Sequence, residues 1–304
     1  HLENRNAVAS CTHAHNMMGK QLELIGDFFG MWRVWDGMRA LDYFLARPEV
    51  DTTRVGLTGN SGGGTISTWL WALDERITMA APSCFVTTFL HNLENELPAD
   101  SEQYPPGVIG SGLDMADFII ARAPSPALLL GQRYDFFDRR GLQQAFDDVA
   151  QFYDLAGAPA ANRDFFIGPQ GHGFSRHNQE AMVKFFARHA ATGSPPRISK
   201  ITTLDSTALD TTPNGNTVAA GAKPIYEWIS ERADQLSRTR HSLSTGRLKK
   251  QLHTLLSLPR RSSTPHYRVL RPQRNGEYTH ARYAIESEGD VRALLHKRLA
   301  HETR

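Results

Sequence analysis

Cysteine is scarce in this chain of 304 residues, which contains only Cys11 and Cys84. Two cysteines allow one bridge, but they cannot form the disulfide framework of a small secreted domain, so they leave the cellular compartment open. An excess of charge of either sign is also missing, because 34 Lys and Arg residues stand against 32 Asp and Glu residues. The bulk charge therefore favours neither nucleic acid nor an anionic membrane surface as a partner.

Long hydrophobic runs are absent as well, and no apolar stretch reaches the roughly 18 residues that a membrane-spanning helix needs. The first ten residues contain neither an initiator Met nor the pattern of a signal peptide. We therefore expect this chain to be a piece of a longer protein. Its composition, 40% hydrophobic and 22% charged, is that of a globular protein with a large core.

Recognisable metal-ligand spacings are missing too. Cys11, His13 and His15 alternate along the chain, but no fourth ligand follows at a spacing known for metal sites. We therefore expect neither a metal nor a cofactor, and the sequence leaves the oligomeric state and the localisation undecided.

Helical and strand-like patterns alternate from residue 17 to residue 192. Apolar residues at helical spacing predict helices, and short apolar runs that end at glycine or polar residues predict buried strands. The predicted strands cover 53–59, 77–85, 126–135 and 163–173, and the predicted helices cover 34–47, 65–75, 141–157 and 175–190. This alternation predicts an α/β fold with a doubly wound, mostly parallel sheet.

The regular pattern dissolves in Pro, Gly, Thr and Asn between residues 193 and 223, which is typical of a linker. Two helical patterns and two strand-like runs, 266–271 and 281–288, follow it. We therefore predict a catalytic core at 1–192, a linker at 193–223, and a helical segment at 224–304 that leads into a second module.

Five glycines surround one serine in the stretch VGLTGNSGGGT, residues 55–65. Residues 59–63 fit the pattern G-x-S-x-G, with a strand pattern before it and a helix pattern after it, as a nucleophile elbow requires. In such a turn we expect Gly59 and Gly63 to lie where a Cβ atom would collide with strand or helix. Ser61 is then the candidate nucleophile, and the N–H of Gly62 is one half of a candidate oxyanion hole.

Phosphate binding is the first rival interpretation of this glycine cluster. A P-loop needs a Lys and a Ser or Thr after its last glycine, whereas Gly64 is followed by Thr65 and Ile66. A dinucleotide-binding fingerprint needs G-x-G-x-x-G, and the run GNSGGG lacks the second glycine at the required place. A glycine turn with a purely structural role stays open as the other alternative.

A nucleophilic serine needs a base and an orienting carboxylate, and in this fold they follow in the order Ser, Asp or Glu, His. Asp135 follows the third predicted strand, and His172 follows the fourth. Both lie at carboxyl ends of strands, where open α/β sheets place their sites. Asp138 is a second candidate for the acid, although it is also a candidate N-cap of the next helix, and His172 has the alternative of a plain surface-loop residue.

Residues 85–108 form an acidic, amide-rich segment between two core strands. It could form hydrogen bonds with sugar hydroxyls, with Asn92 and Glu96 as candidate substrate-binding residues. Equally, it could be a solvated insertion.

Three stretches together resemble a known family: residues 35–65, which hold the elbow, residues 80–108, and residues 128–141 with the sequence LLLGQRYDFFDRRG. They are similar to α/β-hydrolase serine esterases of the acetyl xylan esterase-like and dienelactone-hydrolase-like group, over roughly residues 12 to 192. The resemblance implies Ser61 as nucleophile, Asp135 as acid and His172 as base. It also implies hydrolysis of a small-molecule or polysaccharide ester such as acetylated xylan, and a periplasmic or secreted location.

Two other classes share these motifs, namely prolyl-oligopeptidase-like serine peptidases and catalytically inactive carbohydrate-binding relatives. The resemblance further implies strands and an oxyanion loop that precede the first helix, so we expect the second oxyanion donor to lie upstream of residue 1. From about residue 224 the chain resembles a linker into a second hydrolase-like module that is truncated here.

Overall fold

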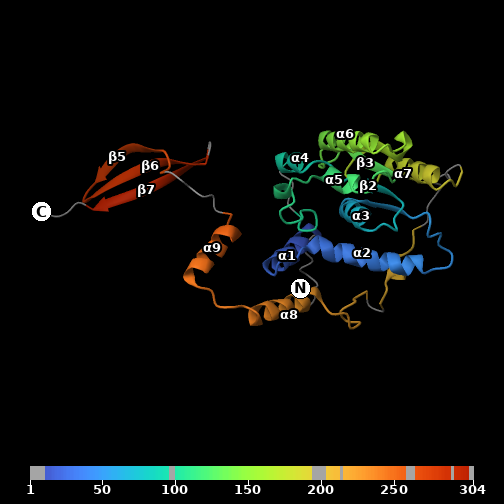
Figure 1. Cartoon of the computed structure of the whole chain (residues 1–304), viewed down its shortest axis with the longest axis horizontal. Coiled ribbons are helices and arrows are strands. Elements are labelled where there is room, and N and C mark those ends of the chain that lie inside the picture. The colour runs from blue at the N-terminus through green and yellow to red at the C-terminus, as the bar shows by residue number, and fades with distance from the viewer. Residues whose placement is uncertain are drawn as a thin grey trace. The chain divides into compact units, whose positions relative to one another are not determined.

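The computed structural model describes residues 11–95, 100–193, 203–212, 215–257, 264–288 and 291–300. The chain divides into two compact units, residues 1–239 and residues 240–304, which are described separately (Figure 1). This division corrects our placing of residues 224–239 with the C-terminal segment. Helix α8 (Ile225–Arg238) belongs to the first unit, because Trp228 packs against Trp32 of helix α2 with ring centroids 6.4 Å apart.

A parallel sheet of four strands forms the centre of the first unit, in the order β1-β2-β3-β4. The strands are β1 (Gly56–Asn60), β2 (Met79–Ser83), β3 (Ala127–Tyr134) and β4 (Arg163–Gly171). Each is paired in parallel with the next, and β2 is buried along its whole length. The prediction of a doubly wound, parallel α/β sheet is therefore confirmed, and all the strands end at the same edge.

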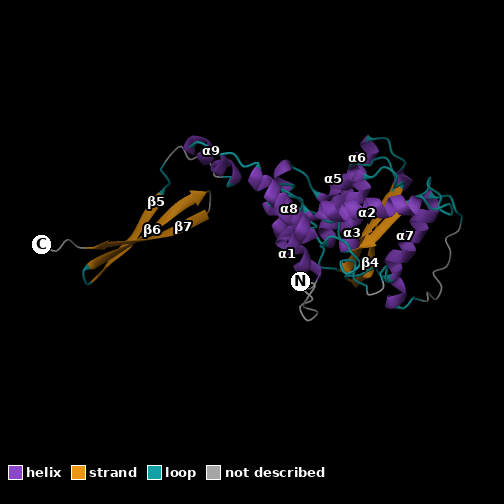
Figure 2. Ribbon diagram, turned by 90° about the horizontal axis from the view of Figure 1, so that it is seen from below, coloured by secondary structure: helices purple, strands orange, loops and turns teal. Residues whose placement is uncertain are grey.

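Helices cover both faces of this sheet. Besides α8, the described part of the first unit contains helices α1 (Cys11–Leu24), α2 (Phe29–Leu45), α3 (Gly62–Leu73), α4 (Phe89–Glu94), α5 (Met115–Ile120), α6 (Arg139–Leu155) and α7 (Arg176–His189). Short 3-10 turns lie at Ile109–Ser111, Ala160–Asn162 and Ser206–Leu209. Figure 2 shows α7 on the other side of the strands from α3 and α5. None of the helices in the described ranges is long and apolar enough to cross a membrane.

The larger hydrophobic core lies between the sheet and helices α2, α3, α5 and α6, and a smaller one lies under α7. Trp71 of α3 is fully buried in the larger core, and its indole N–H donates to the carbonyl of Ile119 at 3.3 Å. In the smaller core, Leu128 and Leu130 of β3 face Phe185 of α7. Successive side chains of β3 therefore point into the two cores in turn, and both faces of the strand are buried, as expected for a strand covered by helices on both sides.

The second unit contains helix α9 (Thr245–Leu255) and an antiparallel sheet in the order β5-β6-β7. Its strands are β5 (Tyr267–Asn275), β6 (Tyr278–Glu288) and β7 (Val291–Ala300). The sequence predicted β5 and β6 but not β7, whose run VRALLHKRLA carries adjacent apolar residues in place of a strict alternation. That this sheet is part of a second hydrolase-like module stays a prediction.

Candidate active site

Ser61 lies in the turn between β1 and α3, in a backbone conformation with φ 58° and ψ −120°. Side chains other than glycine rarely adopt a positive φ, and such strain persists only where the surroundings impose it. Here the Ser61 N–H donates to the carbonyl of Ser83 at 2.9 Å, which ties the turn to the end of β2. Ser61 is the N-cap residue of α3, yet its side chain makes no capping hydrogen bond. Its hydroxyl is therefore not committed to the helix.

The glycines around Ser61 differ in whether they leave space for a Cβ atom. A Cβ atom added at Gly59 would lie 2.3 Å from the carbonyl oxygen of Gly63, and one at Gly64 would lie 2.4 Å from the carbonyl oxygen of Ser83. A Cβ atom at Gly63 would meet nothing within 4 Å. Our expectation for Gly59 is confirmed, whereas that for Gly63 is wrong. The crowded position is Gly64, because the helix packs against the end of β2 one residue later.

His172 and Asp135 lie side by side after β4 and β3. The Nδ1 atom of His172 is 2.8 Å from Oδ1 of Asp135, and the same oxygen accepts the backbone N–H of Phe137 at 3.0 Å. The Asp135 side chain is only 1% exposed, whereas that of His172 is 24% exposed. Asp138 instead caps helix α6 and accepts the N–H of Arg140 at 2.7 Å. The carboxylate that contacts the imidazole is therefore that of Asp135.

A buried glutamine holds the loop that carries His172. The side-chain amide of Gln132 donates to the carbonyl of Gly173 at 2.9 Å and accepts the N–H of Gln170 at 3.1 Å. Because Gln132 belongs to β3, these two bonds fix the ends of the His172 loop to the neighbouring strand. The sequence analysis did not single out Gln132, since its partners lie about 40 residues away, at separations of 38 and 41.

Cys84 borders the same pair, with its sulfur within 4.8 Å of the Asp135 carboxylate and the His172 ring nitrogen. These three side chains have the composition of a metal site, and burial raises the pKa of the Cys84 thiol to about 11. Nδ1 of His172 and Oδ1 of Asp135 are already hydrogen-bonded to each other at 2.8 Å, and the same Oδ1 accepts the N–H of Phe137. This group therefore fits a hydrogen-bonded pair better than a metal centre.

Two aromatic rings, those of Phe136 and Phe137, lie between the Ser61 pocket and His172 in the chain of contacts. Phe136 stacks on His172 with ring centroids 4.1 Å apart, and Phe136 and Phe137 line the same pocket as Ser61 and Gly62. In the described part of the chain, no hydrogen bond joins the Ser61 hydroxyl to His172. The pocket measures about 380 Å³.

Neither of the two candidate substrate-binding residues is among the described residues that line the Ser61 pocket. Asn92 is buried on α4 beside Tyr104 and is not among the residues that line the Ser61 pocket. Glu96 lies outside the described residues. Three other residues of this segment, Asp100, Glu102 and Gln103, are buried and line the pocket. For them, the alternative of a solvated insertion is wrong.

His15 of α1 contacts two of these pocket residues, and the sequence analysis did not predict that contact. Its Nδ1 atom lies 3.1 Å from both carboxylate oxygens of Asp100 and 3.7 Å from Glu102. The hydrogen bond to Asp100 raises the pKa of His15, and burial raises that of Glu102. These three side chains form the other group of the described residues with a metal-like composition. A separation of 85 residues between His15 and Asp100 hid the contact from any local pattern.

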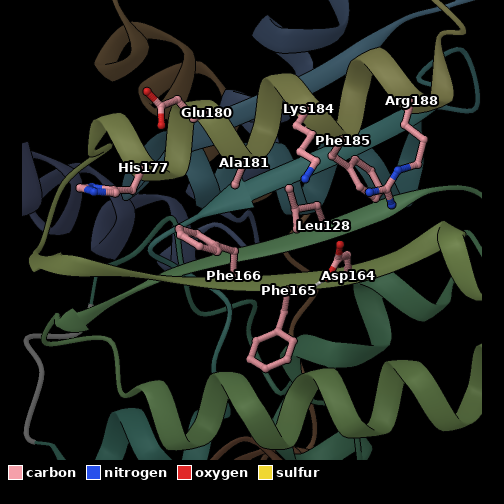
Figure 3. A pocket seen from close by; sticks show the side chains of 10 residues that line it. All are labelled: Leu128, Asp164, Phe165, Phe166, His177, Glu180, Ala181, Lys184, Phe185 and Arg188. Carbon is pink, nitrogen blue, oxygen red and sulfur yellow. Dashed lines mark hydrogen bonds between the residues drawn. The ribbon is translucent and has the colours of Figure 1, made fainter. Parts of the chain in front are cut away.

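A second pocket of about 340 Å³ lies between α7 and the sheet (Figure 3). Lys184 and Arg188 reach over it from α7, and Asp164 lies on β4. Phe165 points to the other side of the strand, toward α6. None of the sequence-predicted site residues lines this pocket, whereas Ser61 and Gly62 line the other one.

No protein-family model matches the chain. A curated Bacillus subtilis (strain 168) protein named "Putative hydrolase YtaP" is 34% identical over 71 residues, which is 23% of this chain. The match spans 24% of that relative, about a quarter of its length.

Similar solved structures include a carbohydrate esterase family 15 glucuronoyl esterase from Caldicellulosiruptor kristjansonii, with a TM-score of 0.46 and 20% identity, over 61% of this chain and 57% of that one. The glucuronoyl esterase catalytic domain of Hypocrea jecorina has a TM-score of 0.47 and 15% identity, over 60% and 57% of the two chains. Methylesterase BT1017 has a TM-score of 0.43 and 24% identity, over 54% and 36%.

Proposed function

We propose that this chain carries the catalytic machinery of a serine-dependent carboxylic ester hydrolase, with Ser61, His172 and Asp135 as nucleophile, base and acid. The observation that carries the proposal is the strained Ser61 turn at the same sheet edge as a hydrogen-bonded His172–Asp135 pair. The limited identity to a protein named as a hydrolase agrees with it. Within this class we favour deacetylation of an acetylated polysaccharide such as xylan, in line with the family resemblance.

In the proposed mechanism, the Ser61 hydroxyl attacks the ester carbonyl carbon while Nε2 of His172 accepts its proton. The Nδ1–H of His172 faces Asp135 at 2.8 Å, which fixes the tautomer and stabilises the imidazolium that forms. Gly62 opens helix α3, so its N–H belongs to the first turn and has no partner within the helix. This N–H and the positive end of the helix stabilise the oxyanion.

Collapse of the tetrahedral intermediate breaks the bond between the carbonyl carbon and the alcohol oxygen. The imidazolium of His172 donates its proton to the departing alcohol, which leaves Ser61 acylated. Water then attacks the acyl group with His172 as base, and the same atoms return the proton to Ser61 as the acid product leaves. The reaction needs no redox step, and each proton taken by His172 is given back.

The proposal is tested by covalent labelling of the full-length protein with a fluorophosphonate probe. We expect one adduct, located on Ser61 by peptide mass spectrometry, together with hydrolysis of 4-nitrophenyl acetate. Both should disappear in Ser61→Ala.

Ser125→Ala is the matched control, because it removes a hydroxyl but keeps the carbonyl that accepts the Tyr153 hydroxyl. This variant should label and turn over like the unchanged protein. Labelling at another residue, or none in protein that circular dichroism shows to be folded, would contradict the proposal.

A further inference from the structure

Glu102 shares the pocket of the proposed nucleophile. Ser61, Gly62 and Glu102 all line the cavity of about 380 Å³. The carboxylate lies directly against Gly62, because a Cβ atom added there would be 2.8 Å from its Oε1 atom. A carboxylate at this place faces any ester whose carbonyl oxygen is held by the Gly62 N–H.

The backbone around Glu102 is held on three sides. Its N–H donates to Oδ1 of Asp100 at 3.0 Å, and its carbonyl accepts the indole N–H of Trp69 at 3.0 Å. The preceding residue, Ser101, donates both its N–H and its hydroxyl to Oδ1 of Asn16 on α1, each at 2.9 Å. The position of Glu102 is therefore built into the fold and does not depend on solvent.

The Glu102 carboxylate itself lacks a hydrogen-bond donor among the described residues. Its side chain is only 3% exposed, and the nearest charged partner, Nδ1 of His15, is 3.7 Å away. That distance exceeds a hydrogen bond, and the same nitrogen lies 3.1 Å from both oxygens of Asp100. A buried carboxylate without donors is costly, so a donor from the pocket would stabilise it strongly.

Chemistry limits which group can donate a hydrogen bond to the Glu102 carboxylate. A metal ion would need His15 Nδ1 and the Asp100 oxygens, which already contact each other and the Glu102 backbone. An acetyl group carries no hydrogen-bond donor, so the donor has to come from the alcohol side of the ester. We propose that Glu102 accepts a hydrogen bond from a hydroxyl on the carbon next to the ester, and so selects monoesters of vicinal diols such as partly acylated sugars.

This inference rests on the proposed esterase activity and is tested with two small esters that differ in one donor. The full-length protein is assayed on 2-hydroxyethyl acetate and on 2-methoxyethyl acetate, where a methyl group replaces the hydroxyl hydrogen. We expect kcat/KM to be at least about tenfold higher for the hydroxyl ester, because hydrogen bonds to charged groups are the strong ones. The ratio should fall in Glu102→Gln and approach 1 in Glu102→Ala, since a neutral amide oxygen is the weaker acceptor.

A merely structural role of Glu102 would slow both esters alike and leave their ratio unchanged. Glu75→Ala, which removes an exposed carboxylate beyond the end of α3, is the control and should keep the ratio of the unchanged protein. Two outcomes would overturn the inference while the esterase activity stands. In one, Ser61-dependent hydrolysis is present but the unchanged protein shows a ratio near 1. In the other, the preference for the hydroxyl ester persists in Glu102→Ala. A preference that disappears with a chelator overturns it in favour of a metal. Absence of Ser61-dependent hydrolysis refutes the proposed function instead.

Discussion

The glycines of the elbow allow a direct steric test of the turn that holds Ser61. In Gly59→Ala the new Cβ would lie 2.3, 2.5 and 2.9 Å from three backbone atoms of Gly63. Backbone atoms cannot rotate away as a side chain can, so strand β1 or helix α3 has to move by about 1 Å. Overpacking of this kind costs about 1–3 kcal/mol, which lowers the Tm of a unit of this size by about 2–12 °C.

Gly63→Ala is the matched control, because a Cβ there meets nothing within 4 Å. Gly63 has helical backbone geometry in the first turn of α3, so alanine should raise stability by about 0.5 kcal/mol. All five Trp residues lie before residue 239, so thermal unfolding followed by tryptophan fluorescence reports on the first unit alone.

The displaced turn should also slow fluorophosphonate labelling of Ser61 in Gly59→Ala, but not in Gly63→Ala. Equal Tm values and labelling rates for the two variants would refute the steric reasoning. A loss in Gly63→Ala alone would restore the original expectation that the second motif glycine is the crowded one.

Two further predictions concern the charged pairs of the site. Asp135→Asn should cut turnover of 4-nitrophenyl acetate by about 10⁴, as loss of an orienting carboxylate does in serine proteases. Asp138→Asn should change turnover much less, because asparagine caps a helix about as well as aspartate. The reverse ranking would move the acid role to Asp138. The hydrogen bond to Asp100 raises the pKa of His15 above its ordinary 6.5, so the folded state binds this proton more tightly than the unfolded state. Its stabilisation is complete below the ordinary pKa and is lost as pH rises through the raised one. In urea titrations from about pH 6 to pH 9, the advantage of the unchanged protein over His15→Gln should therefore shrink, and a constant difference would contradict the assigned contact.

Much of the fold could be predicted because its signals are local. The strand runs are apolar because both faces of β2 and β3 are covered, and Ser175 caps α7 by accepting the N–H of Asn178, as its place before a helical pattern predicts. Gly157, with φ 68°, ends α6 in the left-handed conformation that glycine favours. The elbow was also visible, since its strain requires small residues within a few positions of the serine.

Other features could not be predicted, because their partners are distant in the sequence. Helix α8 has an ordinary amphipathic pattern, and nothing local shows that Trp228 packs on Trp32. The same holds for His15, whose alternation with Cys11 and His13 was weighed only as a metal spacing. Its partner Asp100 lies in a segment with many acidic and amide side chains, and only the tertiary fold shows which of them are buried.

The two sides of the Ser61 pocket share helix α3, which follows Ser61 and carries Trp69, but otherwise have different supports. The proposed nucleophile, base and acid follow β1, β4 and β3, so their mutual geometry depends on strand pairing and on Gln132. Glu102 depends instead on Asn16 of α1 and on the Trp69 indole, neither of which is a sheet contact. We therefore expect substitutions at Asn16 to affect the position of Glu102 more than the contact between His172 and Asp135. In the function proposed here, the elbow supplies the reacting hydroxyl, and the proposed role of the loop that carries Glu102 is to select the ester.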